Sequence, residues 1–328
     1  MEMKPPDSPD FALVHVRRKL NNCNNTLDDV QLETRCPLDN GRHDCMPISM
    51  CFSANQLDRL PLELLIEILL HLDIPSLTRF RSLNRRAMEI VNSVHQYTAI
   101  IEHCPNIIRA IVSIQADGFD CGTLYRTLCT SQCSTCNRFG DHLYLIDCCR
   151  VCYLCFTRRA EYFPLTSREA SKFFTPNAKP QRNAKSSRKL LALAKLPSIL
   201  SLPGRYCYAW TERGGTRRRR LRLYDRRAVV QSLADSGLPQ SDRTTREPKR
   251  FMAIISAPVL LNYGRQVNRG FFCLGCRDSD ESEEEPEHFR IKYTTEGMSE
   301  HIASYGRVER SLTIPSEFMH VTKDQITL

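Results

Sequence analysis

Long apolar runs are missing from this sequence of 328 residues. Its most apolar stretch, residues 252–261, is much shorter than the roughly 18 residues that a membrane-spanning helix needs. The N-terminus, MEMKPPDSPD, also lacks the basic start and apolar core of a secretory signal peptide. We therefore expect an intracellular protein of the cytoplasm, the nucleus or both, with no membrane partner.

Motifs of the common enzyme classes are missing as well. The sequence has no G-x-x-x-x-G-K phosphate-binding loop, no G-x-S-x-G nucleophile elbow and no H-E-x-x-H metalloprotease motif. Each of its histidines stands apart in the sequence from other candidate catalytic residues. We therefore expect that the chain is not an enzyme.

Cysteine, by contrast, is abundant, with 16 in the chain. Cysteines of an intracellular protein stay reduced, so a disulfide scaffold is not expected. Closely spaced cysteine pairs in that compartment favour a metal site instead. The remaining composition, with 41% hydrophobic and 25% charged residues, is typical of a globular protein, and the length suits about two domains.

The strongest chemical signal is the pair Cys133 and Cys136, followed by two overlapping pairs that share Cys152. The downstream pair is either Cys149 with Cys152 or Cys152 with Cys155. Two such pairs supply the four ligands of a tetrahedral zinc ion, and a four-cysteine site has no open position, which indicates structure rather than catalysis. The segment between the pairs, FGDHLYLID, alternates like a strand of a zinc-ribbon hairpin. Spacing alone leaves the choice between Cys149 and Cys155 open.

A second, weaker signal is the pair Cys273 and Cys276 in the segment FFCLGC. Further ligands would have to come from His288, His301 or a distant pair. One additional histidine completes only a three-ligand site, so the sequence leaves a second metal site open. The alternative is that the two thiols pack in the core as small hydrophobic side chains.

Hydrophobic patterning divides the chain into four regions. Residues 1–53 are rich in proline and asparagine and are predicted to be a disordered tail. Residues 54–98 contain three short amphipathic helices, which bury too little surface alone and so need a partner. Residues 99–176 are helical and then cysteine-rich, and residues 177–328 hold a basic segment and a C-terminal region. The expected fold class is α+β, mainly helical, with a small zinc-ribbon-like cysteine hairpin.

Charge is concentrated in two segments of the C-terminal region. Residues 177–228 carry 15 lysines or arginines against two acids. The densest part, from Arg217 to Arg227, is flanked by tyrosines and a tryptophan, so nucleic-acid binding is one alternative function. A solvated loop is the commoner explanation of such a charge run. Residues 278–287 hold seven acids in ten positions and are predicted to be a solvated acidic loop.

The run LDRLPLELLIEILLHLDIPSLTRFRSLNRRAMEIV, in the second region, resembles the F-box. The residues that carry the resemblance are Leu60, Pro61, Glu63, Leu64, Ile68, Leu72, Leu77 and the corner Leu83, Asn84, Arg85 and Arg86. One position departs from the pattern, because Ala87 stands where F-boxes often have tryptophan. The smaller side chain gives the third helix less packing volume.

The rest of the chain is similar to a group of fungal F-box proteins that have a cysteine-rich region after the box. The similarity is carried by the segments LYRTLCTSQCSTCNRFGDHLYLIDCCRVCYLCF, LPSILSLPGRY, FFCLGC and EGMSEHI. For the first metal site this resemblance favours Cys133, Cys136, Cys152 and Cys155, with Cys149 as the alternative. For the second site it implies Cys273, Cys276 and His301, and no good fourth ligand follows within a few residues of His301.

The resemblance implies the substrate-receptor subunit of an SCF-type cullin-RING ubiquitin ligase. In such a ligase the F-box binds a Skp-type adaptor, and through it the cullin, while the rest of the chain recruits a protein target. The adaptor-binding residues implied for this chain are Leu60, Pro61, Leu64, Leu65, Ile68, Leu72 and Leu77. Two alternatives stay open: a zinc-dependent nucleic-acid-binding protein, and an F-box scaffold that works outside a ligase. The sequence does not identify the target.

Overall fold

The computed structural model describes residues 26–38, 60–173, 193–206, 216–232, 248–278, 287–311 and 317–321. Within these residues, no helix is long and apolar enough to cross a membrane. The predicted acidic loop, residues 278–287, lies almost entirely outside the described residues.

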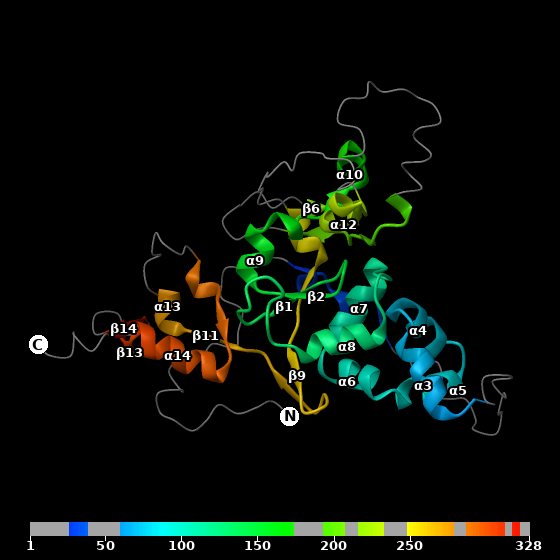
Figure 1. The fold of residues 1–328 in the computed structure, drawn as a ribbon, viewed down its shortest axis with the longest axis horizontal. Coiled ribbons are helices and arrows are strands. Elements are labelled where there is room, and N and C mark those ends of the chain that lie inside the picture. The colour runs from blue at the N-terminus through cyan, green and yellow to red at the C-terminus, as the bar shows by residue number, and fades with distance from the viewer. Residues whose placement is uncertain are drawn as a thin grey trace, which may run out of the picture.

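Six consecutive helices, α3 to α8, form the helical part of the molecule (Figure 1). Their bounds are α3 Leu62–Leu70, α4 Ile74–Arg81, α5 Arg85–Ser93, α6 His95–His103, α7 Pro105–Ile114 and α8 Cys121–Cys129. Short polar side chains fix where several of them begin. The Asp73 carboxylate accepts the backbone N–H of Ser76 at the start of α4, and Asp120 caps α8 in the same way.

A short N-terminal segment packs against these helices. It consists of the 3-10 helix η1 (Leu27–Asp29) and helix α2 (Leu32–Arg35), and α2 lies against α7. Leu27 and Leu32 are both buried in the main core. The prediction of a disordered tail over residues 1–53 is therefore wrong for this segment, because a few apolar side chains hold it to the core within a proline- and asparagine-rich stretch.

A three-stranded antiparallel sheet, in the order β2–β1–β8, packs beside the helices. Its strands are β1 His142–Tyr144, β2 Cys149–Val151 and β8 Ile254–Ser256. The β1–β2 hairpin lies between the two cysteine pairs, where the sequence predicted one, and β8 joins it from far along the chain. A second hairpin, β9 (Val259–Leu261) with β10 (Gln266–Asn268), follows, and its strand β9 packs against α8.

A second three-stranded sheet has the order β3–β7–β4, and helix α10 packs on β3, β7 and α12. The bounds in this region are α9 Tyr153–Arg158, η3 Ala160–Tyr162, β3 Leu165–Thr166, α10 Ser167–Phe173, β4 Ser198–Leu200, β5 Gly204–Arg205, β6 Thr216–Arg217, β7 Arg222–Tyr224, α12 Arg226–Gln231 and η5 Pro248–Ala253. Thr166 and Glu169 form a reciprocal capping box at the start of α10.

The C-terminal elements form a module with a small core of its own. Their bounds are β11 Phe271–Phe272, α13 Leu274–Asp278, η6 His288–Arg290, β12 Lys292–Tyr293, α14 Thr295–Tyr305, β13 Arg307–Arg310 and β14 Phe318–Val321. β11 pairs with β12, and β13 pairs with β14. Cys273, Cys276 and Met298 are among the buried residues at the centre of this module.

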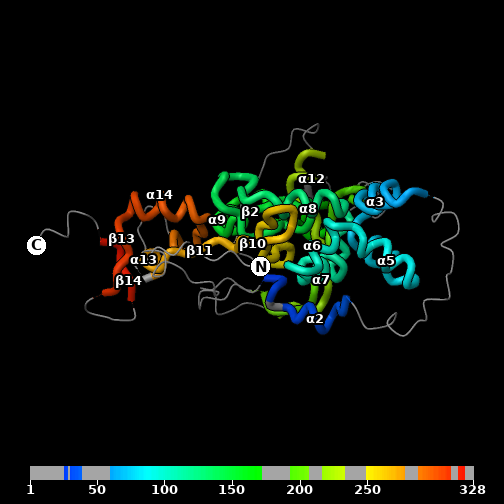
Figure 2. Tube along the Cα trace, turned by 90° about the horizontal axis from the view of Figure 1, so that it is seen from below, coloured from blue at the N-terminus to red at the C-terminus, as the bar shows by residue number. Residues whose placement is uncertain are grey.

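The molecule is elongated, with α3–α5 at one end and α13, α14, β13 and β14 at the other (Figures 1 and 2). The mixed α+β class predicted from the sequence is confirmed. The main core is continuous from α3 to the first sheet, so the helices of residues 60–98 do not form a separate unit. The backbone N–H of Cys121, for example, donates to the carbonyl oxygen of Leu72 at 3.0 Å.

Candidate metal centres and the exposed face of helix α3

Four cysteines gather at the β1–β2 hairpin and form what we call cluster one: Cys133, Cys136, Cys152 and Cys155. Their sulfur atoms all lie within 4.8 Å of one another, and those of Cys136 and Cys152 are 3.6 Å apart. A tetrahedral zinc ion with Zn–S bonds of about 2.3 Å sets neighbouring sulfurs roughly 3.8 Å apart. The donor set and its spacing therefore fit a metal ion of this kind.

Local backbone structure explains how each pair of cluster one comes together. The first pair lies on a tight turn, in which the Asn137 N–H donates to the Cys133 carbonyl oxygen and Asn137 has a left-handed φ of 60°. Asparagine tolerates that conformation better than most residues. In the second pair, Cys152 is the cap of α9 and Cys155 lies in its first turn, where exposed backbone N–H groups favour thiolates.

Mutual hydrogen bonds favour a thiolate within cluster one. Hydrogen bonds from the thiols of Cys152 and Cys155 hold the pKa of Cys133 far below its usual value. The same interaction raises the pKa of Cys152, so Cys152 keeps its proton and Cys133 loses its own. Because the thiolate is the metal-binding form of cysteine, the first ligand of this cluster is available at neutral pH.

Cys149, the alternative ligand, lies outside cluster one. It is in strand β2 opposite Tyr144, and its sulfur accepts an N–H from Arg227 at 3.5 Å. Burial, followed by the nearby Asp147 carboxylate, raises the pKa of this thiol well above its usual value. Cys149 is therefore held as a neutral thiol away from the other four sulfurs.

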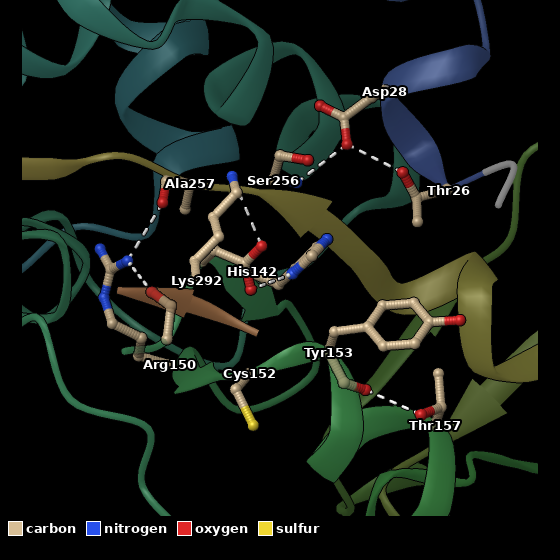
Figure 3. A network of polar contacts seen from close by, with 12 residues as sticks. Thr26, Asp28, His142, Arg150, Cys152, Tyr153, Thr157, Ser256, Ala257 and Lys292 are labelled. Carbon is tan, nitrogen blue, oxygen red and sulfur yellow. Dashed lines mark hydrogen bonds and ion pairs between the residues drawn. The ribbon is translucent and has the colours of Figure 1, made fainter. Parts of the chain in front are cut away.

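Arg150 is buried directly behind cluster one. Its guanidinium donates five hydrogen bonds to backbone carbonyl oxygens, with distances from 2.6 to 3.2 Å. The acceptors are Thr127, Leu128, Gly140, Ala257 and Pro258. Burial lowers the pKa of Arg150 to about 10, which still leaves it charged at neutral pH. All five N–H groups are satisfied, so Arg150 ties α8, the segment before β1 and the segment after β8 together. Figure 3 shows its hydrogen bond to Ala257.

A second group of ligands forms in the C-terminal module and is called cluster two: Cys273, Cys276, His301 and His320. The Cys276 sulfur lies 3.3 Å from Nε2 of His301 and 3.3 Å from Nε2 of His320. Two thiols and two imidazoles within this range form a complete set for tetrahedral zinc. Hydrogen bonds, chiefly with Cys276 and then with the two histidines, also lower the pKa of Cys273.

His320 is the ligand that the sequence analysis missed. Residues after His301 gave no fourth ligand because the chain first runs through β13 and returns in β14, where His320 pairs with Val308. Nδ1 of His320 lies 2.9 Å from the carbonyl oxygen of Gly306, which fixes the proton on Nδ1 and leaves Nε2 to face the cysteines. A side chain at Gly275 would come within 2.9 Å of the His320 ring, so glycine is required there.

A polar network joins the C-terminal module to the first sheet. The Asp141 carboxylate accepts a hydrogen bond from Nδ1 of His142 at 2.7 Å and pairs with Nζ of Lys292 at 3.5 Å. Burial alone would raise the pKa of Asp141, but its neighbours His142 and Lys292 bring it down to about 2. Asp141, Lys292 and Cys152 line the same small pocket, so this ion pair lies close to cluster one (Figure 3).

Helix α3, at the far end of the molecule, is apolar on two sides. Leu65 and Leu69, four residues apart, are buried in the main core. Leu64 and Ile68, also four residues apart, are 53% and 46% exposed. A surface helix of a monomer normally carries a single apolar stripe. We call Leu64 and Ile68 the outer face of α3, and this face is left uncovered by the described part of the chain.

The structure divides the residues that were predicted to bind an adaptor. Those at the surface are Pro61, Leu64 and Ile68, and those half-buried are Leu60 and Leu72. Leu65 and Leu77, by contrast, are 6% and 0% exposed and pack in the main core. The resemblance implied both for the adaptor surface, and this is wrong because Leu65 is on the inner side of α3 and Leu77, on α4, is fully covered by the chain itself.

Several arginines of the basic segment have structural partners. Arg220 donates to backbone carbonyl oxygens of Leu200 and Ser201, and Arg227 pairs with Asp147. The tyrosines expected to interleave with them, Tyr206 and Tyr224, are buried; the remaining two aromatics, Tyr208 and Trp210, lie outside the described residues. Buried rings are not available to stack on bases. Residues 217–219 remain exposed.

A comparison with known protein families matches the part of the chain that contains the outer face of α3. Residues 57–98 match the F-box domain, and this span contains α3, α4 and α5. Neither the curated proteins nor the solved structures gave a match to the chain. The family match does not extend to either ligand cluster. The chain thus contains an F-box domain at residues 57–98, followed by a region with two clusters of cysteine and histidine that can hold metal ions.

Proposed function

We propose that this protein is the substrate-receptor subunit of an SCF-type cullin-RING ubiquitin ligase. Its F-box domain binds a Skp-type adaptor, and through it the cullin, while the region behind the box recruits a protein target. The transfer of ubiquitin is carried out by other subunits, and the chain is not itself an enzyme. The protein works inside the cell, in the cytoplasm or the nucleus.

The outer face of α3 is the observation that carries this proposal. Two large apolar side chains, Leu64 and Ile68, are each about half exposed within the F-box match. Water-exposed apolar clusters of this kind are typical of interaction surfaces. Buried apolar anchors usually dominate the affinity of a protein interface. An adaptor that covers this face would gain that burial without any rearrangement of the inner side of α3.

We further propose that both ligand clusters bind zinc. Cluster one supplies four thiolates, and cluster two supplies two thiolates and two imidazoles. Four protein ligands leave no position for substrate or water, so the ions act by fixing structure. Cluster one holds the cysteine turn against α9, and cluster two holds α13, α14 and β14 together.

Adaptor binding is tested by charge on the outer face. The double variant Leu64→Glu with Ile68→Glu, co-expressed with a Skp-type adaptor, is expected to lose roughly 100-fold or more in affinity, because two central anchors become charged. The inner side of α3 is untouched, so the melting temperature of the variant should stay close to that of the wild type. Pull-down and calorimetry measure both quantities.

The matched control is Tyr263→Glu, which puts the same charge on a side chain that is 85% exposed in the turn between β9 and β10. This variant should bind the adaptor like the wild type. Adaptor binding that survives in the Leu64 and Ile68 double variant would refute the interface. Adaptor binding without recovery of the cullin would instead support a scaffold that works outside a ligase.

A further inference from the structure

A cleft of about 680 Å³ lies between the two ligand clusters. This volume falls within the range of about 300–1,000 Å³ that is typical of binding pockets. One wall is the cysteine turn of cluster one, with Asn137, Arg138 and Phe139. The other wall is β12 and α14, and it includes His301, which is itself a ligand of cluster two. Both clusters therefore shape the same cleft.

The wall made by α14 combines aromatic rings with carboxylates. The ring of His301 stacks on Tyr293 at 4.5 Å between centroids and lies 4.6 Å from the ring of Tyr305. Glu296 and Glu300 line the cleft from the same helix and are both exposed. Tyr305 is 48% exposed beside them, so its ring is accessible from the cleft.

The two carboxylates lack a neutralising partner among the residues that the structure describes. Glu296 and Glu300 are four residues apart on a helix, a spacing at which like charges repel. The lysine of the cleft, Lys292, is already paired with Asp141 at 3.5 Å. Arg138 on the opposite wall supplies one positive charge, against the two negative charges of Glu296 and Glu300. The α14 wall is therefore short of positive charge.

We propose that this cleft binds the protein target, through an extended peptide segment that places a lysine or arginine side chain against the α14 wall. The cation would pair with Glu296 and Glu300 and lie over the ring of Tyr305, a combination of ion pairing and cation–π contact. This inference rests on the proposed receptor function and assigns its target-binding site and the chemistry of the target.

The test uses the full-length chain and a random dodecapeptide library displayed on phage. Peptides selected by the wild-type chain should be enriched in lysine or arginine at one position. A fluorescein-labelled peptide of the selected consensus should then bind Glu296→Gln with Glu300→Gln at least tenfold more weakly in fluorescence anisotropy. Replacing the basic residue of the peptide by glutamine should weaken binding to the wild-type chain by the same factor. This altered peptide should bind the Glu296 and Glu300 double variant as strongly as the original peptide does.

The matched control is the double variant Glu309→Gln with Glu317→Gln, which removes two exposed carboxylates of the same module outside the cleft. It should bind the peptide like the wild type, and both double variants should keep the wild-type metal content and adaptor binding. The inference is overturned if no peptide is selected, if selected peptides lack a basic position, or if both double variants bind equally. Failure of the wild-type chain to bind the adaptor would instead refute the receptor function.

Discussion

At the scale of single residues, the buried Arg150 side chain links segments of the chain through five hydrogen bonds. A buried charge is costly unless it is fully hydrogen-bonded, and this guanidinium meets that condition with backbone carbonyl oxygens alone. Its acceptors lie on three separate segments, one of which, residues 257–258, is far from the other two in sequence. The residue therefore supports the turn that presents the first cysteines of cluster one.

Replacing Arg150 by lysine should be strongly destabilising despite the conserved charge. Lysine has three donors and no planar fork, so at least two buried carbonyl oxygens lose their partner, and we expect a loss of about 2–4 kcal/mol in the free energy of unfolding. Urea unfolding in the presence of zinc measures this. Arg126→Lys is the control, because Arg126 is exposed on α8 and should change stability by less than about 0.5 kcal/mol. Equal effects of the two substitutions would contradict the role of Arg150.

At the scale of elements, cluster one shows what sequence spacing can and cannot decide. The two cysteine pairs and the hairpin between them were predictable, because close-spaced thiols and a short alternating segment are local patterns. Spacing left Cys149 and Cys155 equivalent, and only the resemblance favoured Cys155. The structure separates them because Cys149 belongs to strand β2, whereas Cys152 and Cys155 follow the strand at the start of α9.

Replacing Cys133 by serine should therefore affect metal binding differently from replacing Cys149 by serine. Cys133→Ser removes a zinc ligand, and because metal binding contributes folding free energy directly, we expect loss of one metal ion per chain and unfolding of the region behind the F-box. Cys149→Ser should keep the metal and change stability far less. Elemental analysis with limited proteolysis distinguishes the two. Metal retention by Cys133→Ser would refute the ligand assignment, as would metal loss in Cys149→Ser.

Cluster two depends on an element pairing that no short motif encodes. His320 reaches the cysteines only because β14 pairs with β13 and because Gly275 leaves room for its ring. No local spacing links His320 to His301, so the resemblance implied three ligands where the fold brings four together. The same limit explains α3, where the two apolar sides are equivalent until α5 and α8 pack on one of them.

His320→Ala should remove one of two zinc ions per chain and loosen only the C-terminal module. The remaining three ligands bind zinc too weakly to resist dialysis against a mild chelator, whereas cluster one keeps its ion. His320→Cys should retain both ions, because a thiolate replaces the imidazole. The control is His288→Ala, since His288 stacks beside His301 but is not a ligand. Loss of metal from His288→Ala, or two ions in His320→Ala, would contradict cluster two.

At the scale of the whole molecule, the F-box is built into the rest of the chain. Helix α4 packs on α7, α3 packs on α8, and one core runs from these helices to the first sheet. This continuity could not be predicted from the sequence, in which the F-box pattern ends as if it were a separate domain. It means that the outer face of α3 is held at a fixed distance from cluster one, whose cysteines belong to the same core. Cluster two lies in the module at the end of the elongated molecule opposite α3 (Figure 2).

The most direct test of the account is native mass spectrometry of the chain co-expressed with a Skp-type adaptor, with elemental analysis of the same chromatographic peak. We predict a one-to-one complex that carries two zinc ions per receptor chain. A zinc-loaded chain that elutes without the adaptor would contradict the proposed receptor function, and an adaptor complex without zinc would contradict both metal centres.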